Sequence, residues 1–233
     1  MANIYGPEIF KGENITDVYP RVLDFIVGKE YCYALVTVLE KPISEKEEVV
    51  DEELSLIGIN LNREIHEKYK RFIFGDGKSG LEKIRKRIEI FLEGRYRRAI
   101  TSFRQLSFVL KALHLLNKRI WLYNRLLCLT VNPNFKPLSH VHISNKPVPP
   151  RLLLLDFKPK GEYLNLISVW RLDYVDTAMY GNWIGLSLLL REICLKSGKK
   201  PGHLIVIVNK AVLKDPAASR YLVETFKSRY LLG

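Results

Sequence analysis

The sequence predicts an α/β or α+β fold in which a mixed sheet packs on one long buried helix. Segments with apolar residues at helical spacing alternate along the chain with short β-rich segments. One run, Trp183 to Leu195, is apolar on almost every side and long enough to be a buried helix. The chain has 233 residues, 47% of them hydrophobic, which is enough to bury one sizeable core. We therefore expect a single domain spanning residues 1–233.

The first half of the chain is expected to be mainly helical. Residues 17–27 have helical spacing and end at Gly28, and residues 31–39 are rich in β-formers. Residues 41–53 have the polar, acidic composition of a loop. Further helices are expected at about 62–73, 79–93 and 99–116.

The second half is expected to be mainly β-structure around the buried helix, which Ser197 and Gly198 end. Loops are expected at 136–150, which contains four prolines, and at 158–161. A final helix is expected at 216–229. The predicted strands are about 120–131, 151–157, 163–171 and 203–208.

The cysteines and the hydropathy point to a soluble cytoplasmic protein with no membrane partner. Cys32, Cys128 and Cys194 are odd in number, far apart and surrounded by apolar residues, which favours buried reduced thiols. No apolar run approaches the roughly 20 residues that span a bilayer, and the N-terminus lacks a signal-peptide pattern. His140 and His142 have a spacing that a metal can use, but no third ligand is nearby, so no metal site is predicted.

The positive charge is concentrated in one segment. The formal net charge is +12, and residues 62–125 hold 17 of the 37 Lys and Arg residues but only 6 of the 25 Asp and Glu residues. Concentrated cations attract phosphates, and an interleaved tyrosine can stack on bases. The alternative is a pair of solvated helix faces. The candidate nucleic-acid-binding residues are Lys83, Arg85, Lys86, Arg87, Arg95, Tyr96, Arg97 and Arg98.

Two acidic residues follow the strand predicted at 163–171. Asp173 and Asp176 flank Tyr174-Val175, where catalytic or ligand-fixing groups are often mounted. The alternative is a helix-cap or turn role for both carboxylates.

The order of motifs in the second half carries a family resemblance. The motifs are Pro149-Pro150 before a strand, Gly161, a second strand ending in Val169-Trp170-Arg171, Asp173, Asn182, a long apolar helix, and Ser197 to His203 before a short strand. This order resembles the core of thymidylate synthase and of its deoxycytidylate hydroxymethylase relatives. With Asn124 to Pro133, Gly94 to Arg98 and Gln105, the resemblance covers about residues 85–233. It implies a thymidylate-synthase-like fold.

The resemblance also implies that family catalysis is lost. The family has its nucleophilic cysteine directly after the two prolines, where this chain has Arg151. A protonated guanidinium has no lone pair to attack with. Ala211 and Leu213 stand where the family has the His and Tyr that bind the ribose, and Asp156 replaces a Gln.

The phosphate and base contacts of the family persist. Arg171 matches the arginine that holds the nucleotide phosphate, and Arg125 matches one of two arginines lent by a partner subunit, the other being Asn124 here. Asn182 matches the asparagine that reads the pyrimidine, and Asp173 fits its position with a shift of one residue. The implied nucleotide-binding or phosphate-binding residues are Arg125, Arg151, Arg171, Asp173 and Asn182. The alternative is that these arginines pair with Asp156, Asp173 or Asp176.

Two functional hypotheses follow. The favoured one is a non-catalytic binder of an anionic partner, which is a nucleotide at the family site or RNA or DNA on the basic 62–125 surface, with ribosome association left open. The alternative is an enzyme with altered methyl- or hydroxymethyl-transfer chemistry on a pyrimidine nucleotide. No cofactor is expected, although folate stays open if the family's site is retained. The resemblance further implies a homodimer formed through the face of the main sheet, by strands at 122–131, 151–157 and 163–171.

Overall fold

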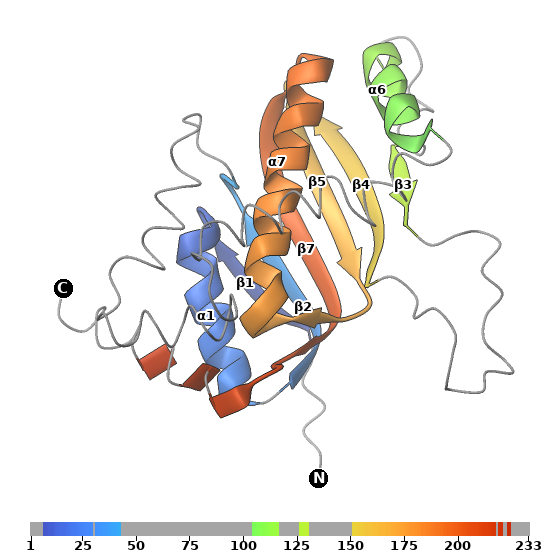
Figure 1. The fold of residues 1–233 in the computed structure, drawn as a ribbon. Coiled ribbons are helices and arrows are strands. Elements are labelled where there is room, and N and C mark those ends of the chain that lie inside the picture. The colour runs from blue at the N-terminus through green and yellow to red at the C-terminus, as the bar shows by residue number, and fades with distance from the viewer. Residues whose placement is uncertain are drawn as a thin grey trace, which may run out of the picture.

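The structure is a computed structural model that describes residues 7–29, 31–42, 104–116, 126–130, 151–217, 219–220 and 223–224. These residues form a mixed α/β fold with a seven-stranded mixed sheet and three α-helices, which confirms the predicted fold class (Figure 1). The helices expected at 62–73 and 79–93, most of the 41–53 loop, the 136–150 loop and the His140–His142 pair lie outside the described residues.

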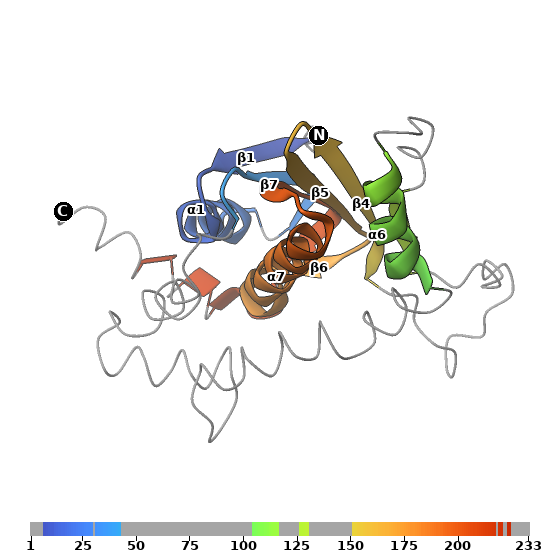
Figure 2. The ribbon, with the colours of Figure 1, turned by 90° about the horizontal axis from the view of Figure 1, so that it is seen from above.

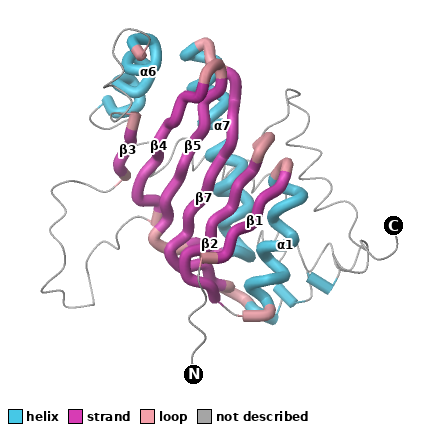
Figure 3. Tube along the Cα trace, turned by 180° about the vertical axis from the view of Figure 1, so that it is seen from behind, coloured by secondary structure: helices cyan, strands magenta, loops and turns pink. Residues whose placement is uncertain are grey.

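Six of the strands follow one path across the sheet in the order β1-β2-β7-β5-β4-β3 (Figure 3). The seventh strand, β6, pairs with β7 off this path. The pairs β1–β2, β5–β7 and β6–β7 are parallel, and the other pairs are antiparallel. The strands are β1 (Glu8–Gly12), β2 (Tyr31–Leu39), β3 (Leu127–Leu129), β4 (Leu152–Lys160), β5 (Tyr163–Trp170), β6 (Asp173–Tyr174) and β7 (Lys200–Val212).

The strands predicted at 31–39 and 163–171 are confirmed, but the loop predicted at 158–161 is wrong over most of its length. β4 continues to Lys160, and only Gly161 and Glu162 turn the chain into β5. Lys160 and Tyr163 flank this two-residue turn, so the next pair, Pro159 and Leu164, is a non-hydrogen-bonded pair. In such a pair the N–H of residue 159 would point away from β5. Proline, which has no N–H, therefore costs the β4–β5 pair no hydrogen bond at this position.

The strand predicted at 203–208 is also longer in the structure. β7 runs over 13 residues because β2, β5 and β6 all pair with it. β1 and β6 were not predicted, since β6 has only two residues and the five residues of β1, EIFKG, do not alternate between apolar and polar.

The described helices agree with the predicted ones apart from their starts. α1 (Ile15–Val27) begins after Asn14, whose side chain accepts a hydrogen bond from the Asp17 N–H at 2.9 Å, and ends at Gly28. α6 (Gln105–Leu115) is the described part of the helix predicted at 99–116. α7 (Tyr180–Ser197) is the buried helix and follows a π-helical turn, Val175–Met179. The described residues between 216 and 224 are helical.

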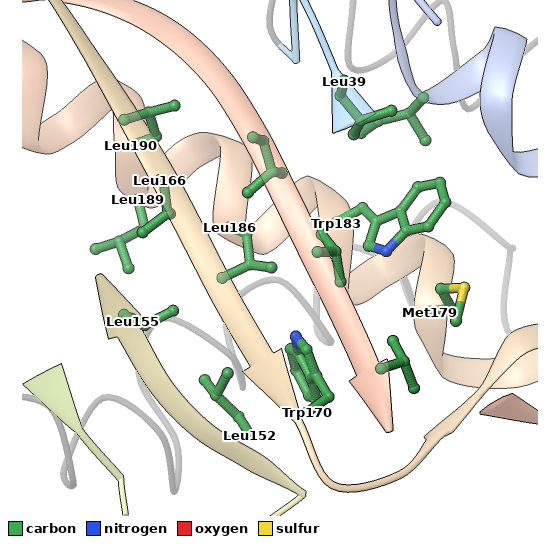
Figure 4. Packing of buried hydrophobic residues seen from close by; sticks show 14 of the residues in the cluster. Leu39, Leu152, Leu155, Leu166, Trp170, Met179, Trp183, Leu186, Leu189 and Leu190 are labelled. Atoms are coloured by element: carbon green, nitrogen blue, oxygen red, sulfur yellow. The ribbon is translucent and has the colours of Figure 1, made fainter. Parts of the chain in front are cut away.

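Helices α1 and α7 both cover the same face of the sheet (Figure 2). The core lies between this face and the helices, with Trp170, Leu155 and Leu186 packed between the strands and α7 (Figure 4). The Tyr19 hydroxyl of α1 is buried and donates to the carbonyl of Val175 at 3.0 Å. This bond ties α1 to the π-helical turn that leads into α7.

The opposite face of the sheet is covered by none of the described helices (Figure 3). Its cross-strand neighbours form two rows. One row consists of Ile9, Val36, Ile207, Val169, Leu154 and Leu129. The other consists of Lys11, Val38, Ile205, Ile167, Asp156 and Leu127. We call the apolar members of these rows the apolar band; all of them are half-buried or exposed.

The β3 edge of the sheet is closed by a side chain. The Gln105 amide donates to the carbonyl of Leu129 at 2.9 Å and accepts from the N–H of Leu129 at 2.7 Å. The amide thus occupies the two backbone groups that another strand would use, which protects the edge against unwanted pairing.

A local kink changes the alternation of β2. Cys32 and Leu35 are both buried in the core although three positions separate them, because Ala34 has the left-handed φ of 55°. Without this kink, strict alternation would turn Tyr31 and Tyr33 to the same side as Leu35. The kink therefore keeps both tyrosines on the open face.

Ala34→Gly should raise the free energy of unfolding by about 0.5–1 kcal/mol, because glycine adopts a left-handed φ without a Cβ clash. The Ala34 side chain is exposed, so no packing is lost. The matched control is Ala112→Gly inside α6, which should lower the free energy of unfolding by about 1 kcal/mol or more. Urea unfolding of both variants measures this; an equal loss of stability in both would contradict the left-handed assignment.

Candidate anion-binding site

Four of the five predicted phosphate-binding residues are described, and they lie at one end of the sheet as two contacting pairs, Arg151 with Arg171 and Asp173 with Asn182. Arg151 precedes β4, Arg171 follows β5, Asp173 belongs to β6 and Asn182 lies in the first turn of α7. Arg125 and all eight residues predicted to bind nucleic acid lie outside the described residues.

The two arginines are neighbours across the β4–β5 pair. The N–H of Arg171 donates to the carbonyl of Arg151 at 2.7 Å. Residues joined this way have Cα atoms about 5 Å apart, so two guanidinium groups start from adjacent backbone positions. Both side chains are half-buried. One anion can therefore be reached by both.

Arg151 is held by an aromatic ring. Its guanidinium carbon lies 4.4 Å from the centroid of the Tyr174 ring, which is cation–π distance. None of the carboxylates that the structure describes is within ion-pair distance of Arg151, and Asp156 pairs with Lys158 at 2.9 Å. The alternative that Arg151 pairs with Asp156, Asp173 or Asp176 is therefore wrong, while the same alternative for Arg171 stays a prediction. A guanidinium that stacks on an aromatic ring keeps its N–H groups, which lie in the plane of the guanidinium, available for an anion.

The buried Asp173 and the half-buried Asn182 form a polar pair. The Asn182 amide nitrogen lies 3.0 Å from each carboxylate oxygen of Asp173, and the Tyr174 N–H donates to Oδ1 at 3.0 Å. Because a carboxylate only accepts, the contact fixes the orientation of the Asn182 amide and turns its carbonyl oxygen away from Asp173. This arrangement joins β6 to the first turn of α7.

Asp176 has a structural role. Its Oδ2 accepts hydrogen bonds from the Lys214 N–H at 2.8 Å, the Asp215 N–H at 2.7 Å and the Ser219 hydroxyl at 3.3 Å. Asp176 therefore connects the π-helical turn to the segment after β7, in agreement with the turn role considered from the sequence.

None of the cysteines provides a nucleophile. Cys32, Cys128 and Cys194 are free and buried, as predicted. Burial raises the pKa of the Cys128 and Cys194 thiols to about 12, and burial and the nearby Glu8 raise the pKa of Cys32. All three thiols are thus protonated and unreactive at neutral pH.

The described residues contain neither a metal-binding cluster nor a membrane-spanning helix. Within these segments, no group of three His, Cys, Asp or Glu side chains is placed to hold a metal ion. No helix among them has the length and apolar character needed to cross a membrane.

The sequence interpretation missed Tyr174 as a site residue. It follows directly after Asp173, so its side chain points to the other side of the short strand β6, next to Arg151. Only strand alternation could have predicted this direction of the Tyr174 side chain, and a strand of two residues is too short to show alternation.

No protein-family model and no curated protein sequence matches the chain.

Asn182→Asp should destabilise the protein increasingly as pH rises from 4 to 7. Two carboxylates about 3 Å apart repel, so one of them keeps a proton with an apparent pKa above that of an unfolded-chain carboxyl. Folding then takes up a proton, and stability falls with rising pH by up to about 1.4 kcal/mol per unit. The control is Asn209→Asp on the exposed side of β7. Urea unfolding at several pH values should show the extra pH dependence in Asn182→Asp alone; its appearance in both variants, or in neither, would contradict the pair.

Proposed function

We propose that this protein is a non-catalytic binder of an anionic ligand of the nucleotide class, held at Arg151 and Arg171. The observation that carries the proposal is the adjacency of these two half-buried arginines, with Arg151 stacked on Tyr174 and in no ion pair with a described carboxylate. Arginine is the side chain best suited to phosphate, because its planar fork donates two parallel hydrogen bonds.

The resemblance to thymidylate synthase supports a nucleotide as the ligand. Arg171 matches the family's phosphate arginine and Arg151 stands at the position of the nucleophile, so the resemblance requires these two positions to be close. They are joined by a backbone hydrogen bond. Asn182, which matches the residue that reads the pyrimidine, is fixed by Asp173. These points support a thymidylate-synthase-like fold, which we propose for the whole chain as a single domain.

The absence of catalysis is proposed from the chemistry of the same residues. A guanidinium replaces the thiol, and the three thiols of the chain are buried with raised pKa values. Ala211, which stands at one of the two ribose-binding positions, is fully buried and offers no hydrogen bond from its side chain. The enzymatic hypothesis, with folate as its cofactor, remains the alternative that an activity assay tests.

The basic segment 62–125 provides a second candidate function, the binding of RNA or DNA. Its support is the charge asymmetry of the sequence, since this segment holds 17 Lys and Arg residues against 6 Asp and Glu residues. Polyanion binding on this segment and nucleotide binding at the two arginines are compatible, and both place the protein in the same class of non-catalytic anion binders.

Arg151→Ala and Arg171→Ala should each weaken the binding of uridine or deoxyuridine 5′-monophosphate by about tenfold or more, because each removes charge-assisted hydrogen bonds worth about 1.5–3 kcal/mol. Arg171→Lys should bind more tightly than Arg171→Ala but more weakly than the wild type, since lysine keeps the charge but lacks the planar guanidinium that donates two parallel hydrogen bonds. The control is Lys158→Ala on β4, the strand that Arg151 precedes; Lys158 pairs with Asp156. Titration calorimetry measures the affinities. Equal binding of the unphosphorylated nucleosides, or an equal loss in Lys158→Ala, would refute phosphate recognition by the arginines.

The protein should release no tritium from C5-labelled deoxyuridylate in the presence of methylene-tetrahydrofolate, because no thiol is placed to attack C6. Arg151→Cys should not restore release, since Ala211 and Leu213 leave the ribose unheld. Release well above a heat-inactivated sample would favour the enzymatic alternative.

We further propose that the open face of the sheet pairs with a second copy of the chain. The apolar band crosses the centre of this face with half-buried valine, leucine and isoleucine side chains. Helices α1 and α7 lie on the other face of the sheet (Figure 2). A contiguous apolar surface that no helix covers marks an interaction site. In a two-fold dimer, the apolar band of each copy would pack against the apolar band of the other copy. The resemblance implies the same pairing.

Val169→Asp and Ile207→Asp, each in the middle of the band, should convert the dimer to a 27.1 kDa monomer in sedimentation at micromolar concentration. Leu195→Asp, at an exposed position of α7, is the control and should leave the dimer intact. A wild-type protein that sediments as a monomer would rule out this pairing.

A further inference from the structure

Beyond the arginine site, the open face carries a second group of aromatic and cationic side chains, which we call the tyrosine patch: Tyr31, Tyr33 and Lys210. Tyr31 and Tyr33 are 48% and 54% exposed, which is high for aromatic residues inside a strand. Their rings meet edge to face with centroids 5.5 Å apart. The Lys210 ammonium lies 5.6 Å from one ring centroid and 5.7 Å from the other.

The backbone is shaped to present this patch outward. Opposite the left-handed Ala34 of β2, strand β7 also interrupts its alternation, because Val208 and Ala211 are buried while Asn209 and Lys210 both point outward. Tyr33 pairs with Lys210 directly across the two strands. A non-glycine residue with a left-handed φ costs about 1–2 kcal/mol, and such strain persists where the surroundings require it. The interrupted alternation keeps two aromatic rings and a cation in water.

The patch continues toward the arginine site on the same face. Tyr174 pairs with Val212 of β7, and Val212 pairs with Tyr31 of β2. Two strand spacings therefore separate Tyr174 from Tyr31, a distance of about 10 Å. Since Arg151 stacks on Tyr174, this end of the sheet carries two aromatic groups, each with its own cation.

We propose that the tyrosine patch stacks the bases of a single-stranded nucleic acid, with Lys210 and Arg151 contacting its phosphates. This inference rests on the proposed function, because it assigns the ligand of the arginine site to a longer strand rather than a free nucleotide. Exposed aromatic rings on a sheet surface next to cations are the chemistry that single strands require, since every base has a face to stack and every linkage a negative charge.

The charges around the tyrosine patch favour a single-stranded nucleic acid as its ligand. Among the residues that the structure describes at this end, those pointing outward are Tyr31, Tyr33, Ala34, Arg151, Tyr174, Asn209, Lys210 and Val212, and none of these is acidic. A base-paired duplex hides the faces of its bases, so it cannot use the two tyrosines. A second copy packed on the tyrosine patch itself, rather than on the apolar band, would place its own Lys210 and Arg151 near these cations and add like-charge repulsion.

The test is fluorescence anisotropy with a labelled ten-nucleotide oligouridylate, measured over a range of salt concentrations. The Tyr31→Ala/Tyr33→Ala double variant should bind at least about fivefold more weakly, with the salt dependence unchanged, because stacking releases no counterions. Tyr31→Phe/Tyr33→Phe keeps both rings and should bind within about twofold of the wild type. Lys210→Ala should lower the slope of log affinity against log salt by about 0.7, the value for one phosphate contact in a single strand.

Several outcomes would overturn the inference. They are undiminished oligouridylate binding by the Tyr→Ala double variant, equal losses in the Phe and Ala variants, and no binding by the wild type. A shift of the Tyr→Ala variant from dimer to monomer in sedimentation would assign the patch to an interface between copies instead. Uridine monophosphate titrated into the same variants separates the two proposals. If it binds through Arg171 while the strand does not bind through the patch, the proposed function stands and this inference fails. If the oligouridylate binds through the tyrosine patch and uridine monophosphate does not bind, the inference stands and the proposed mononucleotide binding fails.

Discussion

The pairing of β7 with strands on both sides is the constraint on which the rest of the structure depends. β7 is antiparallel to β2 and parallel to β5 and β6, so it joins the N-terminal and C-terminal parts of the described chain in one sheet. Its alternation assigns Leu204, Val206 and Val208 to the face under α7 and Ile205 and Ile207 to the open face. A register slip of one residue would exchange these two sets and expose the core.

The placement of both helices on one face divides the molecule into functional surfaces. The covered face packs on α1 and α7 and includes the buried Trp170 and Trp183 in its core (Figures 2 and 4). The side chains of the open face contact water or a partner. The centre of the open face is apolar, whereas its end at Arg151, Tyr174 and Lys210 is cationic and aromatic. Self-association at the centre and anion binding at the end can therefore coexist in the proposed account.

The sequence predicted the elements with strong local patterns and missed those that tertiary pairing creates. The buried helix, the strand at 31–39 and the buried cysteines were predicted because burial leaves a local signal in the sequence: a long apolar run, β-forming residues or apolar neighbours. The extension of β4 through Pro159 was missed, since the tolerance for proline depends on which backbone groups face a neighbouring strand. In the site, the residue types were predicted, but the stacking of Arg151 on Tyr174 was not, because no local pattern encodes a contact between residues 23 positions apart. The kink at Ala34 was equally invisible, since alanine has no preference for a left-handed φ.

The central claim is that Arg151 and Arg171 act together on one phosphate, and NMR of the guanidinium Nε–H signals tests it most directly. Titration of the protein with uridine 5′-monophosphate should shift the Arg151 and Arg171 signals with the same midpoint. The signal of Arg21, which pairs with Asp17 on α1, should stay unchanged. A shift of neither arginine on saturation with the nucleotide, or shifts with two different midpoints, would contradict the account.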